Sequence, residues 1–411
     1  MILLGALALQ TATPAASTDS APVAESVHSG AHISGALLLV GQHATHDTPG
    51  DPDKNAGSLR ADLELELPLG HFGTARGLLY AHARAGRENA LESLGPMFTG
   101  AVNSTAFGDE DGGAKAILAQ VWYQLALPLG MAGDASGQLE FALGKIDPFG
   151  FFDQNALADD ESEAFLNNVF VHNPLLDSGG DIGGDAYGFA PGVRLAYTGS
   201  LGAERSWAAS LGLFGAGSDV SFERPPGDPL SIVQAEYAGP TLGTQPGSYR
   251  LYAWRNRRAT PFNNEADIRE ETHTGWGVSA DQRLTETAGV FARYGHSTRG
   301  YVAFDRALTL GLQVSGSLWG REDDALGLAW GWLRSSSAFR QAAPVLDADA
   351  DTVADFGYVA AGSEQQAELF YNWRPNPHLL LTPDVQWIRR PGGDAAANNA
   401  VVWSLRIKAS F

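Results

Sequence analysis

The last eleven residues of the chain alternate between two kinds of side chain, and this pattern constrains the fold more than any other. The odd positions from Val401 to Phe411 are apolar, and from Ser404 onward the even positions are polar or charged. A period of two residues predicts a β-strand with one apolar face and one polar face. The apolar face of such a strand covers either the core of a soluble sandwich or the lipid side of an outer-membrane barrel. Trp403 near the start of the strand, the charges on its opposite face and the terminal aromatic ring favour the barrel.

Other aromatic residues support the same interpretation. Trp330 and Trp332 share a face with leucines, and Tyr371 and Trp373 end the apolar face of another predicted strand. Amphipathic rings near strand ends are typical of the two interfacial girdles of a membrane barrel. In the alternative, a soluble sandwich, a second sheet would have to cover each apolar face. We therefore expect an all-β, transmembrane antiparallel β-barrel.

Composition is consistent with one large exported domain. The 411 residues contain no cysteine and show no break in composition that would mark a domain boundary. Acidic residues outnumber basic ones by 47 to 27, for a net charge of −20. That sign argues against a nucleic-acid partner, because a phosphate-binding surface needs positive charge.

The first 29 residues resemble a secretory signal, with a short apolar run followed by small residues around Ala12–Ala16. A basic segment is missing, because no Lys or Arg precedes Lys54. We interpret residues 1–29 as an incomplete signal peptide, with a disordered tail as the alternative, and residues 30–411 as one barrel domain. No later run of about 18 apolar residues occurs, so the chain can cross a membrane only as a closed barrel.

The period-two pattern predicts sixteen strands, an even number as in bacterial outer-membrane barrels. Their predicted ranges are 30–43, 56–68, 73–86, 116–129, 136–146, 187–199, 205–215, 229–238, 247–257, 271–284, 287–297, 304–319, 324–336, 363–374, 377–388 and 399–411. Short and long connections alternate between them, as expected for periplasmic turns and extracellular loops. The strand at 229–238 has the weakest pattern, and its loss would break the even number.

The third long connection, 147–186, is too apolar for a freely solvated loop. The segment 144–176 contains five Phe residues. A sixteen-stranded barrel has an open aqueous lumen, so we expect this loop to fold inward, bury its rings against the wall and narrow the pore with Asp153 and other acidic residues. Within it, the stretch DDESEAFLNN predicts a short helix capped by Asp159 or Asp160.

The same loop and several later segments resemble the carbohydrate-selective porins of the bacterial outer membrane. The similarity rests on GKIDPFGFFDQNALADDESEAFLNN, VFVHNP, YGFAPGVRLAY, SYRLYAW and LLTPDVQWIRRPGG, and on the terminal LRIKASF. It covers roughly residues 115–411, while residues 30–114 match only in pattern. This resemblance implies a sixteen-stranded, sugar-permeable channel with an inward third loop and a constriction of arginine, acidic and aromatic side chains. The short, acidic loop at 337–362 departs from the family pattern.

Candidate residues for the solute pathway come from the predicted polar faces and the third loop. A sugar pathway needs planar donors and acceptors for hydroxyl groups, and aromatic faces for the apolar side of a pyranose ring. The candidates are Arg84, Asp153, Arg194, Arg250, Tyr252, Trp254, Arg293, Glu368, Asp384 and Gln386. The alternative is that lumen charges merely solvate the wall and pair with each other. For any one of these residues, we favour the alternative. For the ten residues taken together, we favour a role in the solute pathway.

Other chemistry is sparse, and we expect no enzyme activity, cofactor or metal. Asp347, Asp349 and Asp351 imitate the first ligands of a calcium loop, but Thr352 and Tyr358 stand where that loop needs Gly and Glu. A solvated acidic loop, or one that bridges cations to lipopolysaccharide, is the better interpretation. The sequence contains no phosphate-binding loop, nucleophile elbow or HExxH motif.

Three functions remain open: a passive sugar-selective porin, which we favour, a general or ion-preferring porin, and an outer-membrane enzyme on a barrel scaffold. The predicted inner face is rich in arginine although the chain is acidic, which favours binding of neutral sugars over attraction of cations by net charge. The expected location is the bacterial outer membrane. The expected partners are carbohydrate solutes, lipid and lipopolysaccharide, with a monomer and a homotrimer both open.

Overall fold

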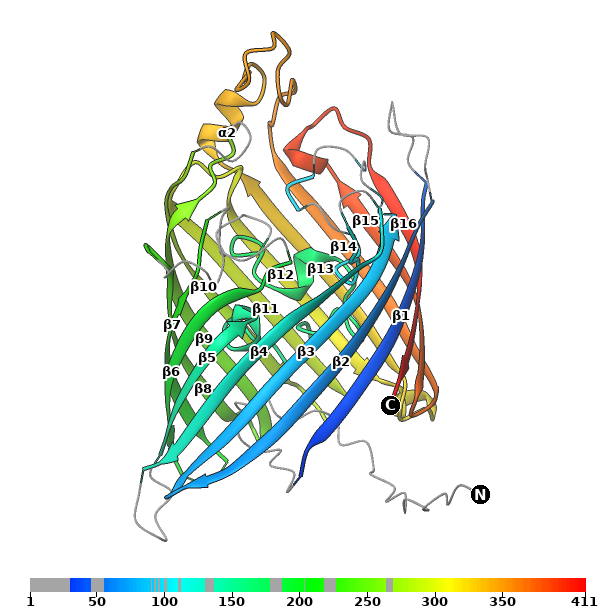
Figure 1. Ribbon diagram of the computed structural model, residues 1–411. Helices are drawn as coiled ribbons and strands as arrows, with labels where there is room; N and C mark the ends of the chain where they lie inside the picture. The colour runs from blue at the N-terminus through cyan, green and yellow to red at the C-terminus, as the bar shows by residue number, and fades with distance from the viewer. Residues whose placement is uncertain are drawn as a thin grey trace.

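The computed structural model describes residues 30–45, 55–89, 91, 94, 97–99, 102–109, 112–129, 137–177, 187–202, 204–217, 227–263 and 269–411. The signal-like segment 1–29 lies outside the described residues. Sixteen antiparallel strands form one closed barrel in which each strand pairs with its neighbours in sequence (Figure 1). The first strand pairs with the last, and this contact closes the barrel. The predicted fold class is thereby confirmed.

The observed strands follow the predicted ones along the whole chain. They are β1 His32–Ala44, β2 Asn55–Phe72, β3 Ala75–Asn89, β4 Lys115–Pro128, β5 Gln138–Ile146, β6 Ala190–Ser200, β7 Ser206–Phe214, β8 Leu230–Leu242, β9 Gln245–Ala259, β10 Glu271–Arg283, β11 Ala288–Arg299, β12 Phe304–Ser315, β13 Ala325–Ser335, β14 Ser363–Asn376, β15 Leu379–Arg389 and β16 Ala400–Ser410. The strand with the weakest sequence pattern is present as β8. Short turns gather at one end of the barrel and long loops at the other (Figure 1), which in outer-membrane barrels are the periplasmic and extracellular ends.

Three predicted strand ends are wrong by four residues. The strand predicted at 56–68 continues to Phe72, so that β2 and β3 leave only residues 73 and 74 between them. The strand predicted at 304–319 ends at Ser315, whose hydroxyl accepts a hydrogen bond from Ser317 N and starts the short 3₁₀ helix η2, Gly316–Trp319. The connection predicted at 239–246 is shorter, because β8 and β9 leave only residues 243 and 244 between them. Gly243 adopts φ +65° there, a conformation that glycine permits at little cost.

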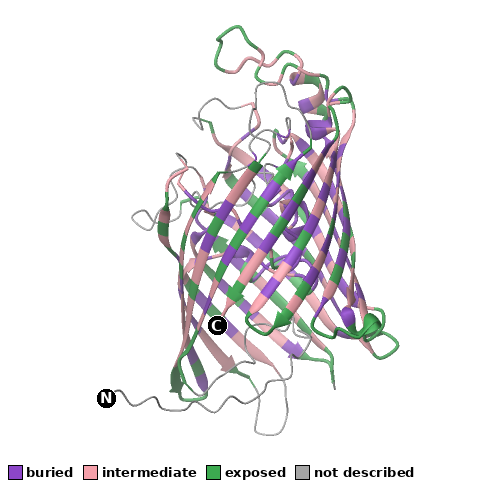
Figure 2. Cartoon of the chain, turned by 90° about the vertical axis from the view of Figure 1, so that its right-hand side faces the viewer, coloured by how far each residue is buried: buried purple, intermediate pink, exposed green. Residues whose placement is uncertain are grey.

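Each strand presents an apolar face outward and a polar face inward. On β16, Trp403 and Leu405 are 55% and 46% exposed, whereas Ser404 between them is 8% exposed and Arg406 after them is 1% exposed. The exposed apolar side chains lie where lipid would cover them, and the polar ones face the lumen. Figure 2 shows the same alternation as buried and exposed residues along the strands.

The helices are short. They are η1 Pro148–Gly150, α1 Asn168–Val171, η2, α2 Ser337–Ala342 and η3 Pro391–Gly393. None of the helices in the described part of the chain has the length and apolar character needed to cross a membrane. The helix predicted within DDESEAFLNN is wrong, because the N–H groups of Leu166 and Asn167 donate to the Glu368 carboxylate rather than to a helical turn. Helix α1 begins only after Asn167, whose side chain accepts a hydrogen bond from Val169 N.

Candidate pore constriction

The third loop, residues 147–189 between β5 and β6, contacts the polar inner face of the strands. The N–H of Asp153 donates to Gln234 Oε1 on β8 at 3.0 Å. On β10, Ser279 Oγ donates to the carbonyl of Gln154 at 2.9 Å. On β16, Lys408 Nζ donates to Ser162 Oγ at 2.8 Å. These contacts take the loop from one side of the barrel interior to the other.

Aromatic rings of the loop form the apolar core of the interior. Phe152, Phe165 and Phe170 are at most 1% exposed. Phe165 packs against Phe370 of β14 and Phe291 of β11, with ring centroids 5.0 and 5.5 Å apart. Burying one such ring stabilises the fold by roughly 1.5–3 kcal/mol. The rings therefore hold the loop against the wall.

Glycines on the inner face make room for this packing. A Cβ atom added at Gly331 of β13 would lie 2.6 Å from Val169 Cγ1, and one at Gly295 of β11 would lie 2.5 Å from Asn173 Oδ1. Real Cβ atoms do not approach other atoms so closely, so the loop could not sit at these places on a wall with larger residues. The wall is thus shaped for the loop.

Two predicted pathway arginines are buried and paired. Arg293 is 1% exposed, and its Nη1 donates to the carbonyls of Ala158 and Phe170 at 2.8 and 2.7 Å. Its Nε lies 3.2 Å from Asp153 Oδ2. Arg250, also 1% exposed, pairs with Glu236 at 2.9 Å and with Asp281 at 3.1 Å. Both guanidinium groups are covered by protein, and Arg293 fastens the loop directly.

Tyr252 and Trp254 of β9 belong to the same buried region. Tyr252 is 1% exposed, and Trp254 is 3% exposed. The Tyr252 hydroxyl donates to Asp153 at 2.6 Å and accepts from Asn173 Nδ2 at 2.7 Å. Asp153 has φ +60°, unusual for a residue other than glycine. Asp153 is thus the point where β9, β11 and the loop meet.

The predicted candidates on β14 and β15 hold two loops at one place. Glu368 accepts from Leu166 N and Asn167 N at 2.6 and 2.9 Å. Gln386 accepts from Asn167 Nδ2 at 2.9 Å and donates to the carbonyl of Val102 at 2.8 Å. Val102 lies in the second loop, residues 90–114, so these side chains fasten the second and third loops together.

Asp384 stands beside this fastening point on β15. Gln386 Nε2 donates to Asp384 Oδ1 at 3.1 Å, and Asp384 is 5% exposed. Asp384 is therefore covered at the place where Glu368 and Gln386 hold the two loops, and it does not line an open part of the pore.

The remaining candidates, Arg84 and Arg194, differ in exposure. Arg194 of β6 pairs with Glu140 at 2.8 Å and lies 4.8 Å from the centre of the Phe151 ring. Its side chain is 6% exposed, against 17% for that of Arg84 on β3. Arg84 is the most accessible of the predicted pathway arginines.

The apolar core formed by the third loop does not extend to Arg84. The polar side chains around Arg84, on β2, β3 and the facing part of the loop, form what we call the edge. Asp62 of β2 lies 2.7 Å from both Arg84 Nε and Arg60 Nε, and 2.8 Å from His82 Nε2. Arg60 reaches across to Glu161 of the third loop at 2.8 Å. Burial alone would raise the pKa of Glu161, but Arg60 and Arg84 outweigh it and lower the value to about 2. Opposite charges therefore face each other between wall and loop.

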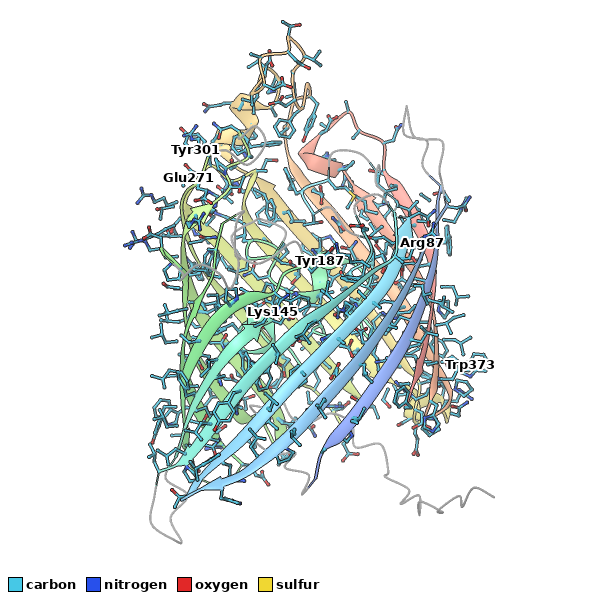
Figure 3. All side chains as sticks on the ribbon, viewed as in Figure 1. Arg87, Lys145, Tyr187, Glu271, Tyr301 and Trp373 are labelled. Atoms are coloured by element: carbon cyan, nitrogen blue, oxygen red, sulfur yellow. The ribbon has the colours of Figure 1, made fainter. Side chains whose placement is uncertain are left out.

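Aromatic rings flank this edge. The Arg84 guanidinium lies 5.9 Å from the Phe107 ring of the second loop and 5.7 Å from the Phe189 ring of the third. Phe107 in turn lies 5.0 Å from the Tyr187 ring. Figure 3 shows Tyr187 and Lys145 within the upper half of the barrel.

His172 extends the edge on the loop side. Its ring stacks on Phe149 with centroids 3.9 Å apart and an angle of 6°. Its nitrogens lie 3.5 Å from Asp177 and 3.8 Å from Asp159. Burial alone would lower the pKa of His172, but Asp177, Asp159 and Asp147 raise it to about 9. Burial raises the pKa of Asp159 to about 7, against the opposing influence of His172 and Arg293.

Our selection of pathway residues did not include this edge apart from Arg84. It omitted Glu161, His172, Phe107 and Phe189. Three of these lie in the segments that carry the family resemblance, whereas Phe107 lies in a loop without pattern. Attention to the ring of VFVHNP and to the aromatic pair of YGFAP could have identified His172 and Phe189.

The acidic loop between β13 and β14 forms a separate cluster. Carboxylate oxygens of Asp347, Asp349 and Asp355 lie within 4.8 Å of one another. Asp347 accepts from the N–H groups of Asp351 and Thr352, each at 3.0 Å. The loop's own donors thus take up carboxylate oxygens of this cluster.

A closed sixteen-stranded barrel with an apolar outer face, a polar inner face and loops packed inside is the architecture of an outer-membrane porin. The family model of the carbohydrate-selective porins, OprB family, matches residues 89–411, and the chain belongs to this family. Its location is therefore the bacterial outer membrane, and the predicted family is confirmed.

Two relatives illustrate how far the similarity extends. Porin B of Pseudomonas aeruginosa is 23% identical over 197 residues, which are 42% of this chain and 43% of that protein. The matched segment thus spans less than half of the relative's length. The structure of Pseudomonas putida OprB superimposes with a TM-score of 0.74 at 18% identity, over 93% of this chain and 94% of that one. At this identity the superposition supports the fold alone.

Proposed function

We propose that the protein lets carbohydrates diffuse passively across the outer membrane, through a constriction between the third loop and the walls of β2 and β3. The observation that carries the proposal is the edge around Arg84, where a partly exposed guanidinium lies near two aromatic rings and beside Asp62. Family membership supports a carbohydrate as the solute. Family and fold both indicate a channel rather than an enzyme.

The chemistry of this edge fits a neutral, hydroxyl-rich solute. A guanidinium offers planar donors in a fixed geometry, and carboxylates accept hydrogen bonds from hydroxyl groups. Phe107 and Phe189 beside Arg84 offer faces for the apolar side of a sugar ring. A hydroxyl group that leaves water can therefore find a donor and an acceptor at Arg84 and Asp62.

Within this proposal the ten candidate residues divide into two groups. Arg84 contacts the solute directly. Asp153, Arg250, Tyr252, Trp254, Arg293, Glu368, Asp384 and Gln386 act by holding the loop that forms the other side of the constriction. Arg194, close to the Phe151 ring and lining a small space with Glu236, is a second contact for the solute.

Export is a further part of the proposal. Residues 1–29 act as a signal-like segment that directs export and is removed from the exported protein. N-terminal sequencing of the purified protein tests this, because a retained Met1 would contradict it.

Block of single-channel current by a panel of sugars tests the constriction. Arg84→Ala should weaken the block roughly tenfold, because a hydrogen bond to a charged group contributes about 1.5–3 kcal/mol. Arg84→Lys, which keeps the charge but loses the planar fork, should have an intermediate effect. The control is Arg257→Ala, which removes the same charge from an exposed pair with Asp228.

The outcome separates the proposal from a general or ion-preferring pore. Such a pore would show no sugar block in the unmodified protein, and both alanine variants would change only its ion selectivity. Equal sugar block in the parent and in Arg84→Ala would place the sugar contact elsewhere.

A further inference from the structure

Two arginines and a histidine stand in a row on the outward face of the barrel. His296 of β11 lies opposite Arg306 of β12, and Arg306 lies opposite Arg334 of β13. The outward direction follows from the register, since the same faces of β12 and β13 carry Leu310 and Leu328, 42% and 51% exposed. The row therefore faces the membrane rather than the lumen.

The row is unfavourable for the isolated chain. Like charges directly opposite each other on neighbouring strands are destabilising. Neutralisation by the chain is partial, because Arg334 Nε is 3.9 Å from Asp305, too far for a hydrogen bond. Arg306 Nε is covered and has no hydrogen-bond partner among the described residues. Among the described residues, Asp305 thus offsets part of the charge of Arg334, and no ion pair is found for Arg306.

The position of the row along the strands indicates its surroundings. It lies near the ends of β11 and β12 that residues 300–303 connect, and near the end of β13 that leads into the long loop before β14, which is the extracellular side. The next outward residues toward the membrane centre include Tyr294 and Trp332, which lie opposite Leu308 on either side. Beyond the row's other end, Trp276 stands edge-on to His296 with ring centroids 6.0 Å apart.

Seen along the membrane normal, the outward face thus carries aliphatic, then aromatic, then cationic side chains. An anchored lipid offers acyl chains, a headgroup at the interface and negative phosphates in the same order. Amphipathic rings mark the interfacial level in membrane barrels. The cationic row therefore lies at the level of outer-leaflet phosphates.

We propose that His296, Arg306 and Arg334 bind phosphate groups of lipopolysaccharide in the outer leaflet. Arginine suits this role, because its planar fork donates two parallel hydrogen bonds to a phosphate. The net charge of the chain is −20, so the row opposes the overall charge. Charge complementarity with a phosphorylated glycolipid accounts for a lipid-facing placement that is otherwise unfavourable.

The test compares two effects of removing the arginines: on stability without lipopolysaccharide and on the binding of added lipopolysaccharide. In lipopolysaccharide-free detergent, replacing Arg306 and Arg334 by Gln should leave the unfolding temperature unchanged or raise it, because it removes like-charge repulsion. With added lipopolysaccharide, the same double variant should bind at least roughly tenfold more weakly than the parent and lose most of the ligand-induced rise. Unfolding is followed by heat-modifiable migration on gels and binding by titration.

The matched control removes two charges from elsewhere on the extracellular rim. Arg87 ends the outward face of β3 on another side of the barrel (Figure 3), and Arg389 ends that of β15. The variant with Gln at both positions should keep the binding of the parent. Lysine at positions 306 and 334 keeps the charge but loses the planar fork, so it should have an intermediate effect on binding. Heat-modifiable migration in lipopolysaccharide-free detergent shows whether the Gln variant is folded.

Four results would overturn the proposal. Dephosphorylated lipopolysaccharide could stabilise the parent as much as the phosphorylated form, or the control variant could lose as much binding as the Arg306 and Arg334 variant. Phosphatidylglycerol vesicles could compete as strongly, which would make the row a general anionic-lipid contact. The double variant could instead shift an oligomer to monomers in native mass spectrometry, which would make the row an interface between copies of the chain.

Discussion

The two sides of the barrel interior use the same residue types in different ways. On the β9–β11 side, Arg293 is 1% exposed and donates to two backbone carbonyls of the third loop. On the β2–β3 side, the Arg84 side chain is 17% exposed and shares Asp62 with Arg60 and His82. An arginine that points into a lumen is therefore a fastener where a loop covers it and a candidate solute contact where the loop leaves a gap.

The physical difference is in what remains after the side chain is removed. Loss of a fully buried guanidinium leaves its partners without water to replace it, which costs more than the pair contributed. Loss of a partly exposed guanidinium leaves groups that water and neighbouring cations can satisfy. The β9–β11 side should thus respond to substitution in stability, and the β2–β3 side in solute binding.

The largest expected effect is that of Arg293→Ala. It leaves Asp153 buried without its cation and two loop carbonyls without a donor, which should cost about 3–5 kcal/mol. Because these groups belong to the third loop, single-channel conductance should rise as sugar block falls. Thermal unfolding and planar-bilayer recordings measure the two consequences.

The control for Arg293→Ala is Arg257→Ala on the exposed rim, where an ion pair contributes about 0–1 kcal/mol. If Arg293→Ala left both stability and conductance like those of this control, the loop would be held by its aromatic rings alone. The comparison between the two sides would then fail.

A smaller effect is expected from Asn167→Ala, because Asn167 is the residue of the third loop that attaches it to β14 and β15. Its side chain donates to Gln366 at 2.6 Å and to Gln386 at 2.9 Å, and it accepts from Val169 N at the start of α1. Losing these bonds should cost about 1–3 kcal/mol. Open-channel current noise should increase, because the loop gains freedom to move.

Gln154→Ala is the matched loop control for Asn167→Ala. The Gln154 side chain donates to the carbonyl of Gly150 within the same loop, so its loss should change stability by no more than about 0.5 kcal/mol. Equal noise in the two variants would show that the β14–β15 attachment does not restrain the loop.

The sequence predicted the strands well because their signal is local. Alternation within ten or so residues is enough to reveal β8 or β16, and the Phe content of the third loop identifies a segment that needs burial. Boundaries failed where a side chain competes with the strand, as Ser315 does at the end of β12.

The roles of the candidate residues could not be predicted in the same way. Period two places Arg84 and Arg293 on the same polar face, and nothing near either one tells which the loop covers. That difference arises from contacts between distant segments, such as Arg293 with Phe170 and Glu368 with Leu166. The sequence therefore predicts which side chains face the lumen but not which of them a solute can reach.

The smallest expected effect is a pH dependence of the loop edge beside Arg84. The folded-state pKa of His172 is raised to about 9 from its ordinary 6.5, so the protonated ring stabilises the folded loop. This contribution is fully present below pH 6.5 and is lost as the pH rises through about 9. Asp159 acts in the same direction at lower pH, because a pKa raised to about 7 makes its ionisation unfavourable in the folded loop.

Conductance and its noise should therefore increase modestly as the pH rises from about 6.5 to 9, because the stabilisation of the folded loop by protonated His172 is lost over this range. Glu161 does not contribute in this range, since its pKa is lowered to about 2. His172→Gln should remove the change while leaving most of the Arg293-dependent stability intact. Arg293 shares Asp159 with His172, but it also pairs with Asp153 and donates to the carbonyls of Ala158 and Phe170. A pH profile that persists unchanged in His172→Gln would assign the titration to another group and separate this edge from control of the pore.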